Sequence, residues 1–214
     1  MVLAFGGISS ALIPAVPLAK YGVDQSSSRA VQRASSQSAA CRRVVNTSVI
    51  RQAQAVQPEI GTAFQQTHIP GVELSEDKQW VRMFHIVMPQ ETDYSSNIWH
   101  GRYVDLLEEI RVHALEVILG VNYGELVRET ETELVVHELN VTYVKPASMG
   151  EKLWVYCSVV RRGIRMVVYG HMDGADDSTV RAKSVVNLVP ISTKTKKPLR
   201  RWPSSFDCIK EEPR

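Results

Sequence analysis

The stretch TDYSSNIWHGRY, residues 92–103, concentrates side chains that can take part in chemistry. It holds a carboxylate, two serine hydroxyls, an amide, an indole and an imidazole, at Asp93, Ser95, Ser96, Asn97, Trp99 and His100. A carboxylate can attack an electrophilic carbon or activate a water molecule, and a helix start offers N–H groups to a developing negative charge. The stretch is therefore either a reactive site or a polar cap of the helix that follows it.

A long amphipathic helix is predicted directly after this stretch. Apolar side chains recur at the three- and four-residue spacing of one buried helix face, at Tyr103, Leu106, Leu107, Ile110, Ala114, Leu115, Val117, Ile118 and Leu119. Gly120 is expected to end the helix as its C-cap, and Ser96 or Asn97 to cap its start. We expect Asp93 to lie beside the N–H groups of the first helical turn.

Five β-strands are predicted around this helix. The first covers residues 81–88 and precedes the helix, and the others follow it at 133–143, 152–160, 164–172 and 179–190. Strands joined by tight turns are antiparallel, so the helix has one sheet to pack against. The predicted fold class is α+β.

Other kinds of site lack their sequence signals. Ser95 or Ser96 with His100 and Asp93 offers the residue types of a catalytic triad, but these groups lie within eight residues and no G-x-S-x-G turn is present. The sequence also lacks the H-E-x-x-H and paired-cysteine spacings of zinc sites, a P-loop and a G-x-G-x-x-G motif. No metal and no cofactor are predicted.

Composition and charge indicate a globular domain with a basic extension. The 214 residues are 44% hydrophobic and 22% charged, with a net charge of +2. Residues 1–70 carry six basic and two acidic side chains, and residues 71–214 carry 19 basic and 21 acidic ones. A slightly acidic body argues against nucleic-acid binding. Three cysteines without paired spacing indicate reduced thiols in a reducing compartment.

Residues 1–75 are expected to lie outside the folded domain. Residues 25–57 contain no acidic side chain and are rich in Ser, Ala, Gln, Val and Arg, which is typical of an organelle transit peptide; a plain disordered extension is the alternative. Residues 58–75 show no clear periodicity and are interpreted as a linker. Residues 76–205 would form the domain, and residues 206–214 a C-terminal tail.

The order of elements and several residues resemble the hot-dog fold, in which a curved antiparallel sheet wraps one long helix. The sequence is most similar to the acyl-CoA thioesterase branch typified by 4-hydroxybenzoyl-CoA thioesterase and its YbgC-like bacterial relatives. The spacing of that family's Asp, His, Tyr, Glu and Arg is matched by Asp93, His100, Tyr103, Glu108 and Arg111. The segment WHGRYVDLLEEIRVHAL resembles cyanobacterial members in particular, and NVTYVKPASMGEKLWV resembles the family's second strand end and third strand start.

The resemblance implies an acyl-thioester hydrolase. Asp93 would be the catalytic carboxylate, acting either as nucleophile or as general base. The backbone N–H groups of His100 and Gly101 would hold the thioester oxygen, and the His100 side chain would assist. Gly101 would also let the substrate approach the backbone closely. The family usually has Gly at the position of Ser96, so the turn after Asp93 departs from its pattern.

Further residues are assigned to substrate binding. Near the helix start and along the helix these are Ser96, Asn97, Trp99, Tyr103 and Glu108, with Trp99 and Tyr103 shaping an acyl pocket or a dimer interface. The basic segment KTKKPLRRWP would contact coenzyme A phosphates or an acidic acyl carrier protein through Lys194, Lys196, Lys197, Arg200 and Arg201. Coenzyme A or phosphopantetheine would be part of the substrate rather than a cofactor.

The resemblance also implies a homodimer or homotetramer, because hot-dog subunits pair sheet to sheet with active sites at the shared interface. The transit-like extension and the cyanobacterial resemblance predict a plastid location, with the mitochondrion as alternative. Two other functions stay open, a hot-dog hydratase or dehydratase and a non-catalytic acyl-thioester-binding protein. The sequence predicts neither the acyl chain nor the choice between coenzyme A and a carrier protein.

Overall fold

The computed structural model describes residues 57–59 and 61–212. The chain divides into two compact units, Met1–Val45 and Asn46–Arg214, and only the second contains described residues. The segment expected to be a transit peptide therefore lies almost entirely outside the described residues. No helix among the described residues combines the length and the apolar character needed to cross a membrane.

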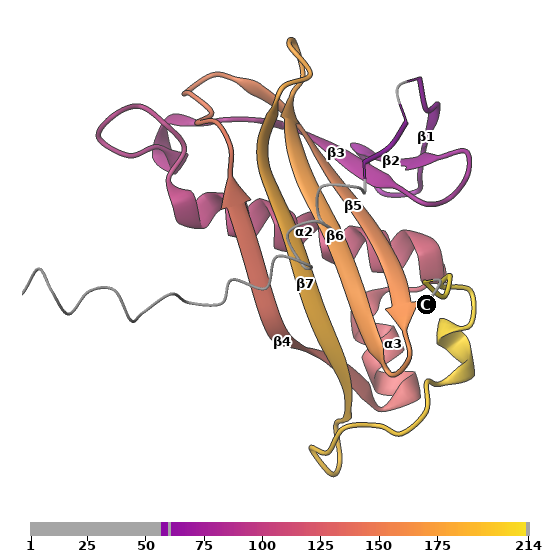
Figure 1. Ribbon diagram of the computed structural model, residues 1–214. Helices are drawn as coiled ribbons and strands as arrows, with labels where there is room; N and C mark the ends of the chain where they lie inside the picture. Colours follow the sequence, from indigo (N-terminus) through magenta and orange to yellow (C-terminus); the bar gives the residue numbers. More distant parts are fainter. Residues whose placement is uncertain (1–56, 60, 213–214) are drawn as a thin grey trace, which may run out of the picture. The chain divides into compact units, whose positions relative to one another are not determined.

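One antiparallel sheet of seven strands forms the body of the described unit (Figure 1), in the spatial order β1-β2-β3-β5-β6-β7-β4. The strands are β1 (Phe64–Gln66), β2 (Val72–Ser75), β3 (Val81–Ile86), β4 (Thr132–Tyr143), β5 (Lys152–Arg162), β6 (Arg165–Gly174) and β7 (Val180–Ser192). All neighbouring strands pair antiparallel, and β4 lies at the edge beside β7. The predicted α+β class is confirmed.

The long helix α2 (His100–Leu119) lies across one face of the sheet (Figure 1), as predicted. Its buried face consists of Tyr103, Leu106, Leu107, Ile110, Ala114 and Leu115. Gly120 ends it in the left-handed conformation at φ 69°, which confirms the predicted C-cap. At the sheet, a Cβ on Gly170 of β6 would lie 2.7 Å from Leu107 Cδ2, so glycine there allows helix and sheet to approach closely.

The central strands alternate between two buried faces. In β5, Leu153, Val155, Cys157 and Val159 belong to the core cluster that includes the buried face of α2. The opposite face holds a second cluster of Trp80, Tyr156, Val167, Tyr169 and Val185. Burial on both faces explains why β5 and β6 read as nearly continuous apolar runs in the sequence.

The sheet is larger than the five predicted strands, because residues expected to be linker join it. Val72 of β2 is buried at 2% exposure in the main core, and β2 pairs with β3. Such short strands carry little periodic signal, so their pairing shows only in the tertiary structure. A second helix, α3 (Tyr123–Thr130), was also not predicted; Asn122 caps it by accepting a hydrogen bond from the Gly124 N–H.

The segment expected to be a C-terminal tail packs against the body. After β7 the chain forms the short helix η5 (Ser204–Phe206), and Phe206 and Ile209 are buried in the main core. Glu212 forms an ion pair with Arg162 of β5 at 2.6 Å. The folded body therefore extends beyond the predicted boundary at residue 205.

The packing of β2 can be tested by comparing two valine truncations. Val72→Ala should lower the free energy of unfolding by about 2 kcal/mol, because it removes two methyl groups from a filled core. Val144→Ala, at a position that is 55% exposed, should change it by less than about 0.5 kcal/mol. Urea denaturation of both variants measures the difference, and equal effects would contradict the placement of residues 64–75 in the domain.

Candidate functional site

A short hairpin carries the predicted reactive stretch from β3 to α2. The Trp99 N–H donates to the Glu91 carbonyl at 2.8 Å, Thr92 forms a bridge with Ile98, and the Asp93 N–H donates to the Asn97 carbonyl at 2.8 Å. The chain reverses at residues 93–97, before the helix begins.

The turn of this hairpin uses the backbone conformation that favours glycine. Ser96 lies at φ 58°, the left-handed region that costs an ordinary residue about 1–2 kcal/mol. The family that the sequence resembles usually has Gly at this position, and Gly adopts this conformation without the Cβ penalty. Hydrogen bonds from the N–H groups of Ser95, at 2.8 Å, and Asn97, at 3.3 Å, to the Asp93 carboxylate help to hold the turn.

The Asp93 side chain is exposed in the single chain. Its carboxylate closes its own turn, and among the described residues it forms no hydrogen bond or ion pair with His100 or Gly101. The neighbouring Tyr94, Trp99 and Met149 are also at least half exposed, which marks this region as open.

The start of α2 has no side-chain cap. Its N-cap residue is Trp99, whose side chain accepts no capping bond, so the prediction of a Ser96 or Asn97 cap is wrong. The Asn97 side chain instead accepts a hydrogen bond from the Ser148 hydroxyl at 3.3 Å. The N–H groups of His100 and Gly101 have no acceptor among the described residues. Two donors at the positive end of the helix dipole are therefore available to an oxyanion.

Gly101 is required by a neighbouring side chain rather than by an open approach to the backbone. A Cβ at this position would overlap ring atoms Cζ3 and Cη2 of Trp99. The Trp99 indole is 51% exposed and also lies against the His100 imidazole, with ring centroids 4.8 Å apart. The indole thus lies on the Cβ side of Gly101.

Tyr103 supports the site instead of lining it. Its side chain is 4% exposed, and burial raises the pKa of its hydroxyl, whose oxygen accepts a hydrogen bond from the Ala147 N–H at 3.0 Å. The segment around Ala147 in turn pairs with the hairpin, because the Ile98 N–H donates to the Ala147 carbonyl at 2.8 Å. Tyr143 of β4 donates to the His100 carbonyl at 3.1 Å, which fixes the first turn of α2 from the sheet side.

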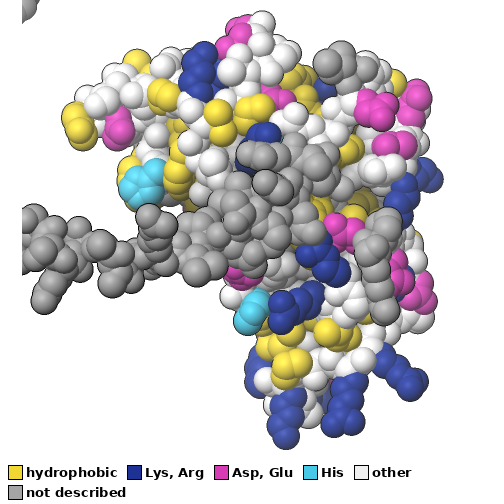
Figure 2. All heavy atoms as spheres, viewed as in Figure 1, with side chains coloured by type: hydrophobic (Ala, Val, Ile, Leu, Met, Phe, Trp, Pro, Cys, Tyr) yellow, Lys and Arg dark blue, Asp and Glu magenta, His cyan; other side chains and the backbone are white. Residues whose placement is uncertain are grey.

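The remaining predicted substrate residues lie away from the helix start. Glu108 is two turns along α2 and pairs with Arg111 at 2.8 Å, beside a hollow of about 390 Å³ between α2, α3 and β4. The basic residues follow β7, and Figure 2 shows Lys and Arg gathered at that end of the body. Lys194 pairs with Glu131 and Lys196 with Glu133, at the beginning of β4. Because Tyr143 ends β4, that strand separates them from His100 by roughly 37 Å.

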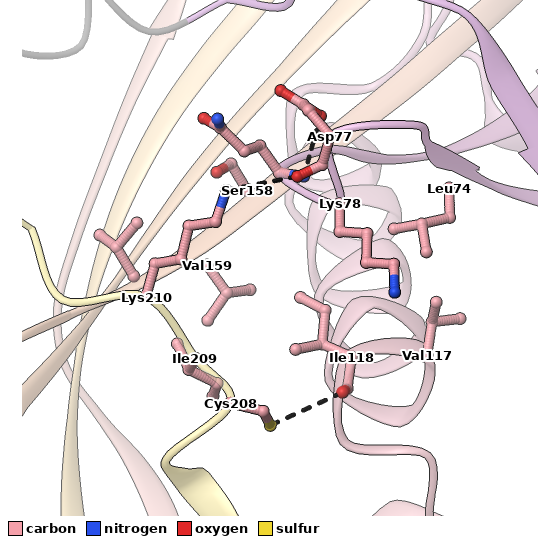
Figure 3. Close-up of a pocket in the computed structure, with 12 residues that line it drawn as sticks. Leu74, Asp77, Lys78, Val117, Ile118, Ser158, Val159, Cys208, Ile209 and Lys210 are labelled. Carbon is pink, nitrogen blue, oxygen red and sulfur yellow. Dashed lines mark hydrogen bonds between the residues drawn. The ribbon is translucent and has the colours of Figure 1, made fainter.

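Surface hollows locate the site only partly. One hollow, of about 360 Å³, lies between the β2–β3 turn, the end of α2 and the C-terminal segment (Figure 3). Lys78, Lys210 and Cys208 line it, and none of the predicted site residues does. A hollow of about 440 Å³ adjoins the start of α2 and is lined by Gln90, Glu91, Thr92, Trp99, Arg102 and Asp105.

Sequence reasoning missed two groups that hold this region together. The buried Glu91 bonds both β3 and α2, and Tyr143 reaches α2 from β4. The available signal for Glu91 was an acid two residues before Asp93, at the end of a strand. Nothing in local spacing connects Tyr143 to His100, which lie 43 positions apart.

Comparison with known proteins confirms the fold. Residues 96–172 match the family described as the thioesterase superfamily. A Synechocystis protein provisionally named as an esterase is 34% identical over 74 residues, which span 35% of this chain and 43% of that protein. The matched segment is thus less than half of that relative's length.

Solved structures of other proteins have the same fold as this chain. A 1,4-dihydroxy-2-naphthoyl-CoA thioesterase from Synechocystis has a TM-score of 0.54 at 13% identity, covering 60% of this chain and 93% of that chain. A Staphylococcus aureus protein described as hypothetical and solved in complex with CoA has a TM-score of 0.55 at 17% identity, covering 60% and 80%. At such identities the likeness shows the fold alone, and the predicted hot-dog fold is confirmed.

The packing of Trp99 over Gly101 predicts that Gly101→Ala changes the free energy of unfolding in opposite directions in the native protein and in a Trp99→Ala variant. Gly101→Ala alone should lower the free energy of unfolding by about 1–3 kcal/mol, because the new methyl group collides with the indole. In a Trp99→Ala background the same change should raise it by up to about 1 kcal/mol, because alanine is the better helix former. A double-mutant cycle by urea denaturation measures both, and the same sign in both backgrounds would show that the indole does not occupy this space.

Proposed function

We propose that this chain is an acyl-thioester hydrolase, which cleaves an acyl-CoA or acyl-carrier-protein thioester to a free acid and a thiol. One observation carries the proposal: the hairpin that bears Asp93 leads directly into a helix whose first N–H groups have no side-chain cap. The match of residues 96–172 to the thioesterase superfamily supports it, because these groups lie in or beside the matched segment.

The chemistry assigned to this geometry has two parts. The thioester oxygen accepts hydrogen bonds from the N–H groups of His100 and Gly101, which strengthen as negative charge develops on that oxygen. The Asp93 carboxylate either attacks the carbonyl carbon, forming an anhydride that water then hydrolyses, or removes a proton from an attacking water. In both routes the thiolate leaves and is protonated. The exposed His100 imidazole at the helix start assists by contacting the substrate.

A second copy of the chain completes the site in this proposal. β4 is an edge strand, and Val135, Val136, Leu139 and Tyr143 on it are 39–48% exposed. A long, apolar, unpaired edge favours pairing with another strand. Antiparallel pairing of two β4 strands forms a homodimer, and two such dimers associate to form a homotetramer.

Such a dimer also gives the basic segment a role. Antiparallel β4 pairing brings the beginning of one β4 beside the end of the other, and that end contacts His100 through Tyr143. Lys194 and Lys196 of the partner subunit would then face this chain's site. Within one chain, the same two residues lie at the other end of β4 from that site. Their charges suit the phosphates of coenzyme A or the acidic surface of a carrier protein.

The catalytic role of Asp93 is tested by thiol release from a panel of acyl-CoA and acyl-carrier-protein thioesters. Asp93→Asn should lower kcat by roughly 100-fold or more, because an amide is a poor nucleophile and base. Asp176→Asn, an exposed acid in the β6–β7 loop, serves as control and should leave kcat unchanged. Equal turnover of the native protein and Asp93→Asn would reject the catalytic role of Asp93, and binding of the thioesters by the native protein without thiol release would favour a non-catalytic binding protein. Conversion of an enoyl thioester without thiol release would favour a hydratase.

The dimer is tested by placing a charge on the edge strand. Leu139→Lys should shift the protein to a monomer in light scattering coupled to gel filtration, because the ammonium groups oppose strand pairing. KM for acyl-CoA should rise in the same variant, since the partner's cations are removed from the site. Ile86→Lys adds the same charge at a 44% exposed position on β3 and should keep the β4 pairing. A Leu139→Lys dimer with native KM would exclude β4 as the interface.

A further inference from the structure

Glu91 joins three separate parts of the molecule through one side chain. It lies in the short helix η4 (Pro89–Glu91) after β3 and is 9% exposed. Its Oε1 accepts a hydrogen bond from Arg102 Nε of α2 at 2.7 Å. Its Oε2 lies 2.9 Å from His85 Nε2 of β3 and accepts a hydrogen bond from the Met88 N–H at 2.8 Å. Strand, connecting loop and helix start are thus bound to one carboxylate.

The backbone of the same residue holds the base of the hairpin. The Glu91 carbonyl accepts from the Trp99 N–H at 2.8 Å, directly before α2 begins. Asp93 lies two residues further along, and its own carboxylate bonds only within its turn. The main chain of the turn also pairs with residues 147–149, but the Glu91 carboxylate is the side-chain link from this hairpin to α2.

The carboxylate of Glu91 is in its charged form at neutral pH. Burial acts to raise the pKa of this group, but the hydrogen bonds from Met88, His85 and Arg102 outweigh burial and hold the pKa below its ordinary value. A charged carboxylate has no proton to give, and hydrogen bonds with Arg102, His85 and Met88 already engage both of its oxygens. Its contribution to a reaction must therefore act through the groups that it holds.

We propose that Glu91 is a positioning residue, which fixes the Asp93 turn in register with the first N–H groups of α2. This inference rests on the proposed function, since register matters to catalysis only if Asp93 and these N–H groups act on one thioester. Loss of the carboxylate frees the hairpin from Arg102 while the reacting groups themselves stay intact. A displacement of about 1 Å between reacting groups can cost as much as 100-fold in rate. Glu91 touches no substrate, so the loss falls on kcat more than on KM.

The chain offers a matched control for this experiment. Glu73 of β2 forms an ion pair at 2.7 Å with Arg82, which lies near the start of β3, whereas the hairpin follows the end of that strand; both side chains are mostly buried. Glu73→Gln and Glu91→Gln therefore remove the same charge from comparable pairs. Both variants are compared at matched folded fractions, established by thermal unfolding followed by circular dichroism.

Two readouts are measured on the full chain. Thiol release should show kcat lowered roughly 10- to 100-fold in Glu91→Gln with KM within about twofold, and both constants unchanged in Glu73→Gln. Amide hydrogen exchange should accelerate at residues 92–99 in Glu91→Gln alone, because the Trp99 and Asn97 N–H groups lose their support. Arg102→Lys, which keeps the charge but removes the Nε donor, should show a smaller effect of the same kind and replaces Glu91→Gln if that variant does not fold.

The outcomes separate this proposal from the proposed function. Native kcat and native exchange at residues 92–99 in Glu91→Gln would overturn the positioning role. Equal losses in Glu91→Gln and Glu73→Gln would also overturn it, because they would indicate a general effect of stability. If the native protein releases no thiol from any thioester, the hydrolase proposal fails. The exchange measurement then still decides whether Glu91 holds the hairpin on the helix.

Discussion

The structure of the site depends on the unpaired N–H groups at the start of α2. A helix start normally satisfies some of its first donors with a side-chain cap, and here the N-cap residue Trp99 offers none. The cost of leaving such donors unbonded is small only where water or a ligand reaches them. The helix therefore begins at the surface, next to exposed side chains, while one face of its remaining turns is buried in the core.

Holding an exposed helix start in one place requires bonds from all around it. Glu91 binds it from the β3 side through Arg102, and Tyr143 binds it from β4 through the His100 carbonyl. The buried Tyr103 hydroxyl receives the Ala147 N–H, so the β4–β5 connection is fastened to the same turn. The donors are free, but the backbone that carries them is fixed from three sides, which is the condition for electrostatic preorganisation.

In a single chain, the residues of the proposed site are exposed to water. Asp93 and Trp99 are exposed, and the edge strand β4 displays apolar side chains beside them. Water would compete for each hydrogen bond that a thioester makes there, and a carboxylate in water is a weak base. A partner subunit over β4 would exclude that water and add cationic groups. The open edge and the open site are thus two consequences of one surface that a second copy can cover.

The sequence by itself determined the α+β class, the helix with its glycine C-cap, and the four long strands after it, because these elements have regular apolar periodicity. It also predicted that Asp93 and His100 lie next to the start of this helix, since these residues are close in the chain. Tertiary structure alone decided that residues 64–75 join the sheet and that the last residues pack on it, because three- and four-residue strands gain their stability from neighbours rather than from their own pattern. It also decided that Trp99 fills the space beside Gly101, that Glu91 bonds to Arg102, and that the basic segment lies at the far end of β4. Side-chain direction and contacts across the sheet settle these points, and neither is encoded in spacing along the chain.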